Sequence, residues 1–178
     1  MEGSLEAPVR HPIPWQDESW YDEAALEAEL RRVYDICHGC RRCFNLCDSF
    51  PILFDAIDEA PNEEVEDLTA GQLKAVVDAC TLCDMCFMTK CPYVPPHSFD
   101  LDFPHLMLRA RAVEHRKGQT SFVDNQLAEM TRNGRLGTLV AGAANWATKE
   151  GNGLTRPLIE ATSGSIPAPT CRRSWTCR

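Results

Sequence analysis

The sequence predicts a mostly α-helical protein in which short helices carry two cysteine-rich loops. Apolar residues recur at the three- and four-residue intervals of one helix face in several segments. No stretch of useful length alternates apolar and polar residues as a strand would. Eight of the ten cysteines fall into two tight runs. We therefore expect the helices to position these two runs.

The first element is expected to be an extended arm over residues 1–17. This stretch carries three prolines and shows no apolar periodicity. Trp15 is expected to pin the arm to the surface of the protein.

A first helix is predicted from about Ser19, and a domain that contains both cysteine runs is predicted over residues 18–118. Acidic residues lie early in this helix and basic residues late, as the helix dipole favours. The helix should deliver Cys37 from its C-terminal end. Gly39 is then expected to let the backbone leave the helix, because a residue without Cβ tolerates the turn. Its buried face is marked by Leu26, Leu30, Val33 and Tyr34.

Two further helical segments are predicted before the second cysteine run. Residues 50–57 are apolar enough to form one or two buried helical turns, and the acidic residues 59–67 form a solvated loop. Thr69 is a predicted N-cap for a helix through Leu73 that runs into Cys80. Both cysteine runs are therefore expected to follow a helix in the same way.

After the second run the chain is expected to be extended and then helical again. Residues 92–97 contain three prolines, each of which biases the preceding residue toward extended geometry. Pro104 suits the first residue of a third helix, and Gly118 suits its end.

The remainder is predicted to be a helical extension and a tail. Weaker helical patterns lie at residues 121–130 and 136–147. We expect residues 119–161 to form a helical extension and residues 162–178 to form a disordered tail. Cys171 lies in this Ser/Pro/Arg-rich tail together with Cys177, and neither is expected to bind metal.

The two cysteine runs indicate iron–sulfur clusters. Three thiolates at a spacing of three let a short stretch of chain curl round one corner of an Fe4S4 cube, and a remote cysteine must supply the fourth ligand. In bacterial-type two-cluster ferredoxins the fourth cysteine of each run binds the other cluster. On that pattern one [4Fe-4S] cluster is held by Cys37, Cys40, Cys43 and Cys91, and a second by Cys80, Cys83, Cys86 and Cys47.

A zinc-stabilised interaction module without a redox role is the alternative, because zinc sites with four cysteines also use C-x2-C pairs. Zinc needs two such pairs per ion, whereas each run here has three evenly spaced cysteines and one more distant cysteine. The spacing therefore favours iron–sulfur clusters. A disulfide framework is disfavoured, because the chain shows no export signal.

Charge and hydropathy exclude several other classes. The formal net charge of -8 argues against a nucleic-acid module, which needs a basic face. No run of eighteen apolar residues is present, which argues against a transmembrane segment. Glu2 and Glu6 stand where a signal peptide would be basic and then apolar, so we expect a cytoplasmic protein.

Several polar residues near the runs are candidates for secondary roles. Arg41, Arg42 and Lys90 flank the cysteines, and cations there would stabilise a reduced cluster and raise its potential. His38 lies inside the first run and is expected to be a hydrogen-bonding neighbour or a solvated residue rather than a ligand. The basic side of the third helix, residues 109–117, is a candidate docking surface for an acidic partner.

The segments ICHGCRRCFNLCDSFP and ACTLCDMCFMTKCPYVPPHSFDLDFPHLMLRARA resemble the proteins related to the iron–sulfur subunits of heterodisulfide reductase and of anaerobic glycerol-3-phosphate dehydrogenase. The resemblance spans about residues 15–118. It implies an α-helical ferredoxin-like fold, two [4Fe-4S] clusters and the eight cysteines as ligands. The implied function is an electron-transfer protein or subunit that relays electrons between redox partners.

The chain departs from that pattern in three places. Cys86 and Cys91 are separated by four residues where bacterial ferredoxins have three, which leaves room for an altered loop around Met88. Asp48 follows Cys47 where a proline often stands. No Cys-Cys-Gly sequence is present, so we expect no catalytic site in this chain. A third hypothesis is that it forms the cluster-bearing part of a heterodisulfide- or glycerol-3-phosphate-type oxidoreductase.

Overall fold

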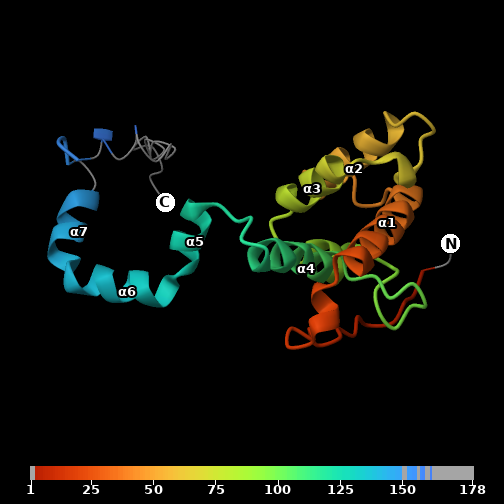
Figure 1. Cartoon of the computed structure of the whole chain (residues 1–178), viewed down its shortest axis with the longest axis horizontal. Coiled ribbons are helices and arrows are strands. Elements are labelled where there is room, and N and C mark those ends of the chain that lie inside the picture. Colours follow the sequence, from red (N-terminus) through yellow and green to blue (C-terminus); the bar gives the residue numbers. More distant parts are fainter. Residues whose placement is uncertain (1–2, 150–151, 156, 159–160, 162–178) are drawn as a thin grey trace, which may run out of the picture. The chain divides into compact units, whose positions relative to one another are not determined.

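The computed structural model describes residues 3–149, 152–155, 157–158 and 161. Every regular element among these residues is a helix, which confirms the predicted mostly α class. The chain divides into two compact units, Met1–Thr120 and Ser121–Arg178, which we call the cysteine unit and the C-terminal unit (Figure 1). The predicted disordered tail at 162–178, with its two cysteines, lies outside the described residues.

In residues 3–120, the cysteine unit is built from four α-helices and three shorter helical turns. In it α1 packs against α4, and α2 packs against α3 (Figure 1). Apolar side chains from all four helices form one core, in which Tyr34, Phe50, Leu53 and Met107 are fully buried. The bounds are η1 Glu18–Tyr21, α1 Glu23–Cys40, α2 Ser49–Asp58, η2 Val65–Asp67, α3 Ala70–Ala79, the π-helical turn η3 Cys86–Lys90, and α4 Phe103–Arg116.

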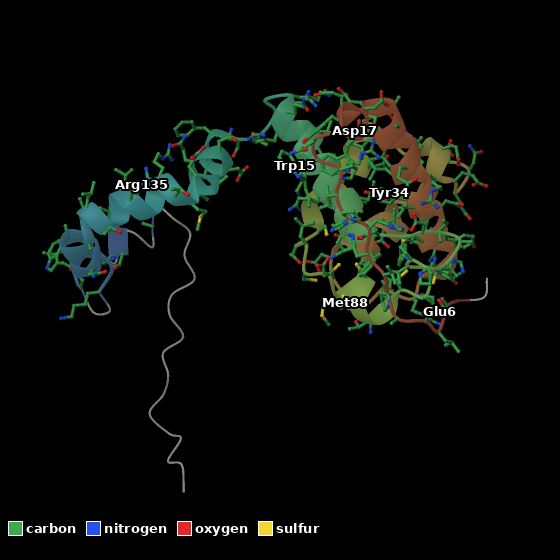
Figure 2. All side chains as sticks on the ribbon, turned by 90° about the horizontal axis from the view of Figure 1, so that it is seen from below. Glu6, Trp15, Asp17, Tyr34, Met88 and Arg135 are labelled. Carbon is green, nitrogen blue, oxygen red and sulfur yellow. The ribbon has the colours of Figure 1, made fainter. Side chains whose placement is uncertain are left out.

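Helix α1 buries the face that its apolar spacing predicts. Asp22 caps its N-terminus, with a carboxylate oxygen that accepts a hydrogen bond from the backbone N–H of Ala25 at 2.6 Å. Tyr34 lies among the helices in Figure 2, and its hydroxyl donates to the carbonyl of Leu73 at 3.3 Å. Burying each large apolar side chain contributes about 1.5–3 kcal/mol, so this face secures α1 to the core. The four predicted positions are buried: Leu26, Leu30, Val33 and Tyr34.

The end of α1 differs from the prediction. Gly39 stays inside the helix, and the residue that leaves it is Arg41, with a left-handed φ of 49°. The N–H of Arg41 donates to the carbonyl of Cys37 at 2.8 Å. The Arg41 guanidinium pairs with Asp58 and lies 5.4 Å from the ring centroid of Phe54. These contacts with α2 support a conformation that normally favours glycine.

Helix α3 begins as predicted and ends differently from α1. Thr69 and Gln72 form a capping box, in which Thr69 Oγ1 accepts from the Gln72 N–H at 3.3 Å and Gln72 Oε1 accepts from the Thr69 N–H at 2.9 Å. The helix stops at Ala79, and Cys80 is already extended. The expectation that both runs follow a helix in the same way is therefore wrong, because the first run begins inside α1.

Helix α4 begins one residue before Pro104. Asp102 is its N-cap, and its carboxylate accepts from the His105 N–H at 3.0 Å. The chain turns after Arg116, and Gly118 takes a φ of 69° that suits glycine. The apolar face of α4, which includes Leu106 and Ala110, is buried against the core.

The N-terminal arm lies along the chain that carries the second cysteine run. The N–H of Ser4 donates to the carbonyl of Pro92 at 2.8 Å, and the N–H of Val9 to that of Pro95 at 2.9 Å. Trp15 is 62% exposed, and its carbonyl accepts a hydrogen bond from the Tyr21 hydroxyl at 2.9 Å. That its side chain pins the arm stays a prediction.

Arg10 fastens the arm to the rest of the cysteine unit. Its guanidinium donates to both carboxylate oxygens of Asp84 at 2.8 and 2.9 Å, and to both of Asp102 at 2.7 and 2.9 Å. It also lies 4.2 Å from the ring centroid of Phe87. One side chain thus ties the arm to the cysteine loop and to the start of α4, and paired carboxylates in this geometry form strong hydrogen bonds.

The C-terminal unit consists of three short helices in its described part: α5 Phe122–Ala128, α6 Met130–Leu139 and α7 Ala141–Thr148. The predicted helix over residues 136–147 is divided at Val140. Among the described residues, none of the helices combines the length and the apolar character needed to cross a bilayer.

We predict that Arg10→Ala loosens the arm while the rest of the cysteine unit stays folded. Lost charge-assisted hydrogen bonds of about 1.5–3 kcal/mol correspond to roughly a tenfold or greater rise in amide exchange over residues 3–10. Hydrogen–deuterium exchange mass spectrometry of the N-terminal peptide measures this rise. His11→Ala is the matched control, because His11 and its partner Asp100 are more exposed, and such pairs contribute little. Equal exchange in both variants would contradict the assignment.

Candidate metal centre

The first cysteine run lies across the end of α1 and the turns that follow it. Cys37 and Cys40 are in the last turns of the helix, and Cys43 and Cys47 lie before α2. The N–H of Leu46 donates to the carbonyl of Cys43 at 2.9 Å, which closes a tight turn inside the run. Because this hydrogen bond joins residues close in sequence, the chain of the first run is turned back on itself instead of being extended.

The second run is curled by two residues in left-handed conformation. Leu82 has a φ of 55° and Asp84 a φ of 62°, and they flank Cys83 on both sides. The N–H of Leu82 points back at Cys80, 3.5 Å from its sulfur atom. Left-handed conformations of this kind cost about 1–3 kcal/mol each and persist only where the surroundings hold them. Here the Arg10 contact holds Asp84.

The longer spacing before Cys91 is accommodated by a π-helical turn. The N–H of Cys91 donates to the carbonyl of Cys86 at 2.8 Å, which closes the turn Cys86–Lys90. The sequence predicted an altered loop around Met88, and in the structure this loop is the π-helical turn. Met88 is 60% exposed and lies at the edge of the unit in Figure 2. The extra residue therefore bulges outward while Cys86 and Cys91 stay on the inner side.

The fold gathers cysteines from both runs. One pocket is lined by Cys37, Cys40 and Cys43 of the first run and by Cys91 of the second, together with apolar side chains that include Phe50 and Leu101. These four cysteines are the set expected for one cluster of a cross-ligated pair. An adjoining pocket shares Cys37, Cys43 and Cys91 and adds Cys86. Whether these cysteines bind metal remains a prediction.

The other four cysteines, Cys47, Cys80, Cys83 and Cys86, lie around the C-terminal end of α3. Burial raises the pKa of Cys80, and negative charge on Cys47 and Cys83 would raise it further. Burial likewise raises the pKa of Cys86, as would charge on Cys43, Cys80 and Cys47. Such mutual effects require the thiols to be close in space. The structure thus brings Cys47 of the first run near Cys80 and Cys86 of the second.

Neutral thiols are favoured in this site unless a positive partner is present. Burial raises the pKa of Cys37 well above its usual value, and charge on Cys91 and Cys43 would add to the effect. Cys80 and Cys86 are buried, whereas Cys83 is exposed. A cationic inorganic core reverses this preference, because it stabilises the thiolates and releases their protons. The donor set therefore fits an iron–sulfur core. In the described part of the chain, no three His, Cys, Asp or Glu side chains are grouped so as to hold a single metal ion.

The flanking cations differ in where they point. Arg42 lines the first pocket and favours the thiolate of Cys91, against the larger effect of burial on that pKa. Arg41 turns away to Asp58, and so does His38, whose Nε2 lies 2.9 Å from an oxygen of that carboxylate. The side chain of Lys90 lies outside the described part.

The basic side of α4 is engaged within the unit. Arg109 donates to the carbonyl of Trp20 at 2.6 Å, Arg116 to Glu18 at 2.5 Å, and Lys117 to Glu23 at 2.7 Å. Arg111 donates to the carbonyls of Val77 and Cys80. These contacts bind α4 to η1, α1 and α3.

The sequence did not identify two residues that contact the cysteines in the structure. Arg111 reaches Cys80 from another helix, and nothing in the basic pattern of α4 distinguishes it from its neighbours. Tyr93 lines the first pocket, and its hydroxyl hydrogen-bonds to Cys40; burial and this sulfur raise the pKa of Tyr93. Its position two residues after Cys91 was the only available signal.

The helices and the gathered cysteines are similar to those expected of a ferredoxin-like domain, and part of the chain is also similar to known proteins of that kind. Residues 31–117 match the family model described as the citrate utilization protein B Fer4-like domain. This match agrees with the expected resemblance to iron–sulfur proteins. The family that it names differs from the heterodisulfide reductase and glycerol-3-phosphate dehydrogenase proteins.

A curated relative carries the same name. Citrate utilization protein B of Escherichia coli is 28% identical over 85 residues, which cover 48% of this chain and 20% of that protein. The match therefore spans about a fifth of the relative's length. No solved structure matches the chain.

We predict that Phe50→Ala strongly destabilises the cysteine unit. Phe50 is 1% exposed, lines both cysteine pockets and lies 4.9 Å from the ring of Phe103. Removing a buried phenylalanine costs about 3–5 kcal/mol, which urea denaturation followed by circular dichroism measures. Ile52→Ala on the same helix is the control, because Ile52 is 37% exposed, and its loss should cost less than about 2 kcal/mol. Similar losses for both variants would argue against the role of Phe50.

Proposed function

We propose that this chain is an electron-transfer protein or subunit that carries two [4Fe-4S] clusters and relays electrons between redox partners. The observation that carries the proposal is the pocket that joins Cys37, Cys40 and Cys43 of the first run to Cys91 of the second, within a segment similar to a Fer4-like domain. The proposed ligand sets are Cys37, Cys40, Cys43 and Cys91 for one cluster, and Cys80, Cys83, Cys86 and Cys47 for the other.

Cross-ligation is supported by the pocket that joins Cys91 to the first run. Cys91 follows the π-helical turn, and its neighbours in that pocket are the three leading cysteines of the first run rather than those of its own. Cys47 supports the converse arrangement, because it lies near enough to Cys80 and Cys86 that negative charge on it would raise the pKa of both. Each run would thus complete the ligand set of the other, as in two-cluster ferredoxins.

The residues around the proposed ligands fit a redox role. When bound, [4Fe-4S] clusters take up and release single electrons. The buried side chains of Phe50, Leu101 and Phe103 would keep water from the inner thiolates. The Leu82 N–H, the Tyr93 hydroxyl and the Arg42 guanidinium lie where they would stabilise negative charge on sulfur.

Anaerobic purification tests the proposal. We expect a brown protein with about eight iron and eight labile sulfide per chain, and a paramagnetic resonance signal after reduction with dithionite. A colourless protein that contains zinc and no sulfide would instead support the zinc-stabilised interaction module. Turnover of a substrate by the isolated chain would support the oxidoreductase hypothesis.

We predict that Cys91→Ser and Cys37→Ser remove the same cluster. Both residues belong to one proposed ligand set although they come from different runs, so the reduced variants should lose the same paramagnetic resonance signal. Cys83→Ser should remove the other signal and loosen the first, because the ligand sets interlock. Cys171→Ser is the control and should leave the iron content unchanged.

Resonance spectra of the reduced, anaerobic variants decide between the two schemes. If Cys91→Ser loses the signal that Cys83→Ser loses, each run binds its own cluster and cross-ligation is wrong.

A further inference from the structure

Arg111 lies where α4 packs against the C-terminal end of α3. Its Nη2 donates to the carbonyl of Val77 at 2.8 Å and to that of Cys80, and lies 3.4 Å from the carbonyl oxygen of Asp78. The last carbonyls of a helix have no partner within the helix, and the negative end of the helix dipole attracts a cation. Arg111 therefore caps α3 at the residue where the second cysteine run begins.

The charge of Arg111 is not neutralised by a nearby acid. The two carboxylates closest along the helices, Asp78 and Glu114, both bind Lys74, at 2.8 and 2.7 Å. Among the described residues, Arg111 forms no ion pair with a carboxylate. Its positive charge can therefore act on the thiols near the C-terminal end of α3.

The surroundings of Arg111 also limit screening by water. Arg111 is half-buried, whereas Arg42, the cation beside the other cysteine set, is exposed. Interactions of partly buried charges are screened much less than those of exposed charges. Arg111 also contacts the ligand residue itself, because its Nη2 donates to the carbonyl of Cys80.

We infer that Arg111 is a positioning residue that fixes Cys80 and holds a positive charge against the second proposed cluster, raising its reduction potential. This inference rests on the proposed function, in which Cys80, Cys83, Cys86 and Cys47 bind one [4Fe-4S] cluster. Reduction adds negative charge to the cluster and its thiolates. A nearby cation stabilises that form more than the oxidised one, so the potential rises.

Arg109 on the same helix provides a matched comparison. It is also half-buried and also donates to carbonyls, those of Trp20 at 2.6 Å and Ser19 at 3.4 Å. Those residues belong to η1, which contains no cysteine. Arg109 thus has the same charge and the same kind of contact, without a proposed ligand beside it.

The test compares Arg111→Gln, Arg111→Lys and Arg109→Gln in the anaerobically purified full chain. Redox titrations followed by paramagnetic resonance give both cluster potentials, and chemical assays give iron and sulfide. We expect Arg111→Gln to keep its iron and to shift one potential to a more negative value, namely that of the signal lost in Cys83→Ser. Arg111→Lys should restore the wild-type potential, because it keeps the charge. Arg109→Gln should shift neither potential.

Several results would overturn the inference. An unchanged potential in Arg111→Gln, an equal shift in Arg109→Gln, or an equal shift in Arg111→Lys would each do so. If Arg111→Gln fails to bind iron, Arg111→Lys decides: full iron with the wild-type potential supports the inference, and loss of iron shows a purely structural role. A wild-type protein without iron would instead overturn the proposed function itself.

Discussion

The structure depends on the convergence of thiols from two distant cysteine runs in a mostly apolar interior. Cys37 and Cys91 line one pocket, and burial raises the pKa of both. Thiolates gathered this closely repel one another, so the arrangement is favourable only when the thiols stay protonated or when a cationic core neutralises them. Folding and metal uptake are therefore expected to be coupled, because each proposed ligand set joins cysteines from both runs.

The other elements keep the two cysteine runs in fixed positions relative to each other. Helices α1 and α3 carry the runs, and α4 packs against both. Arg111 donates to a carbonyl at the end of α3, and Arg109 donates to one in η1, just before α1. The N-terminal arm adds a further restraint, because Arg10 joins it to the loop at Asp84 and to the N-cap of α4 at Asp102. Residues that resemble a generic basic face or a loose arm in the sequence thus support the geometry around the cysteines.

Local patterns in the sequence predicted much of this fold, and contacts between elements decided the rest. The apolar face of α1 and the cap at Thr69 follow from spacing and short-range hydrogen bonds, which a sequence displays directly. The left-handed turn at Arg41 could not be predicted, because contacts with Phe54 and Asp58 support a conformation that sequence rules assign to glycine. The position of Arg111 depends on the packing of α4 against α3, which no motif records.

Native mass spectrometry of the anaerobically purified chain tests the central claim most directly. The account predicts one dominant species whose mass exceeds that of the polypeptide by two Fe4S4 units, and whose clusters leave together with loss of the folded charge-state distribution. A compact species at the mass of the polypeptide alone, or with added zinc only, would contradict it.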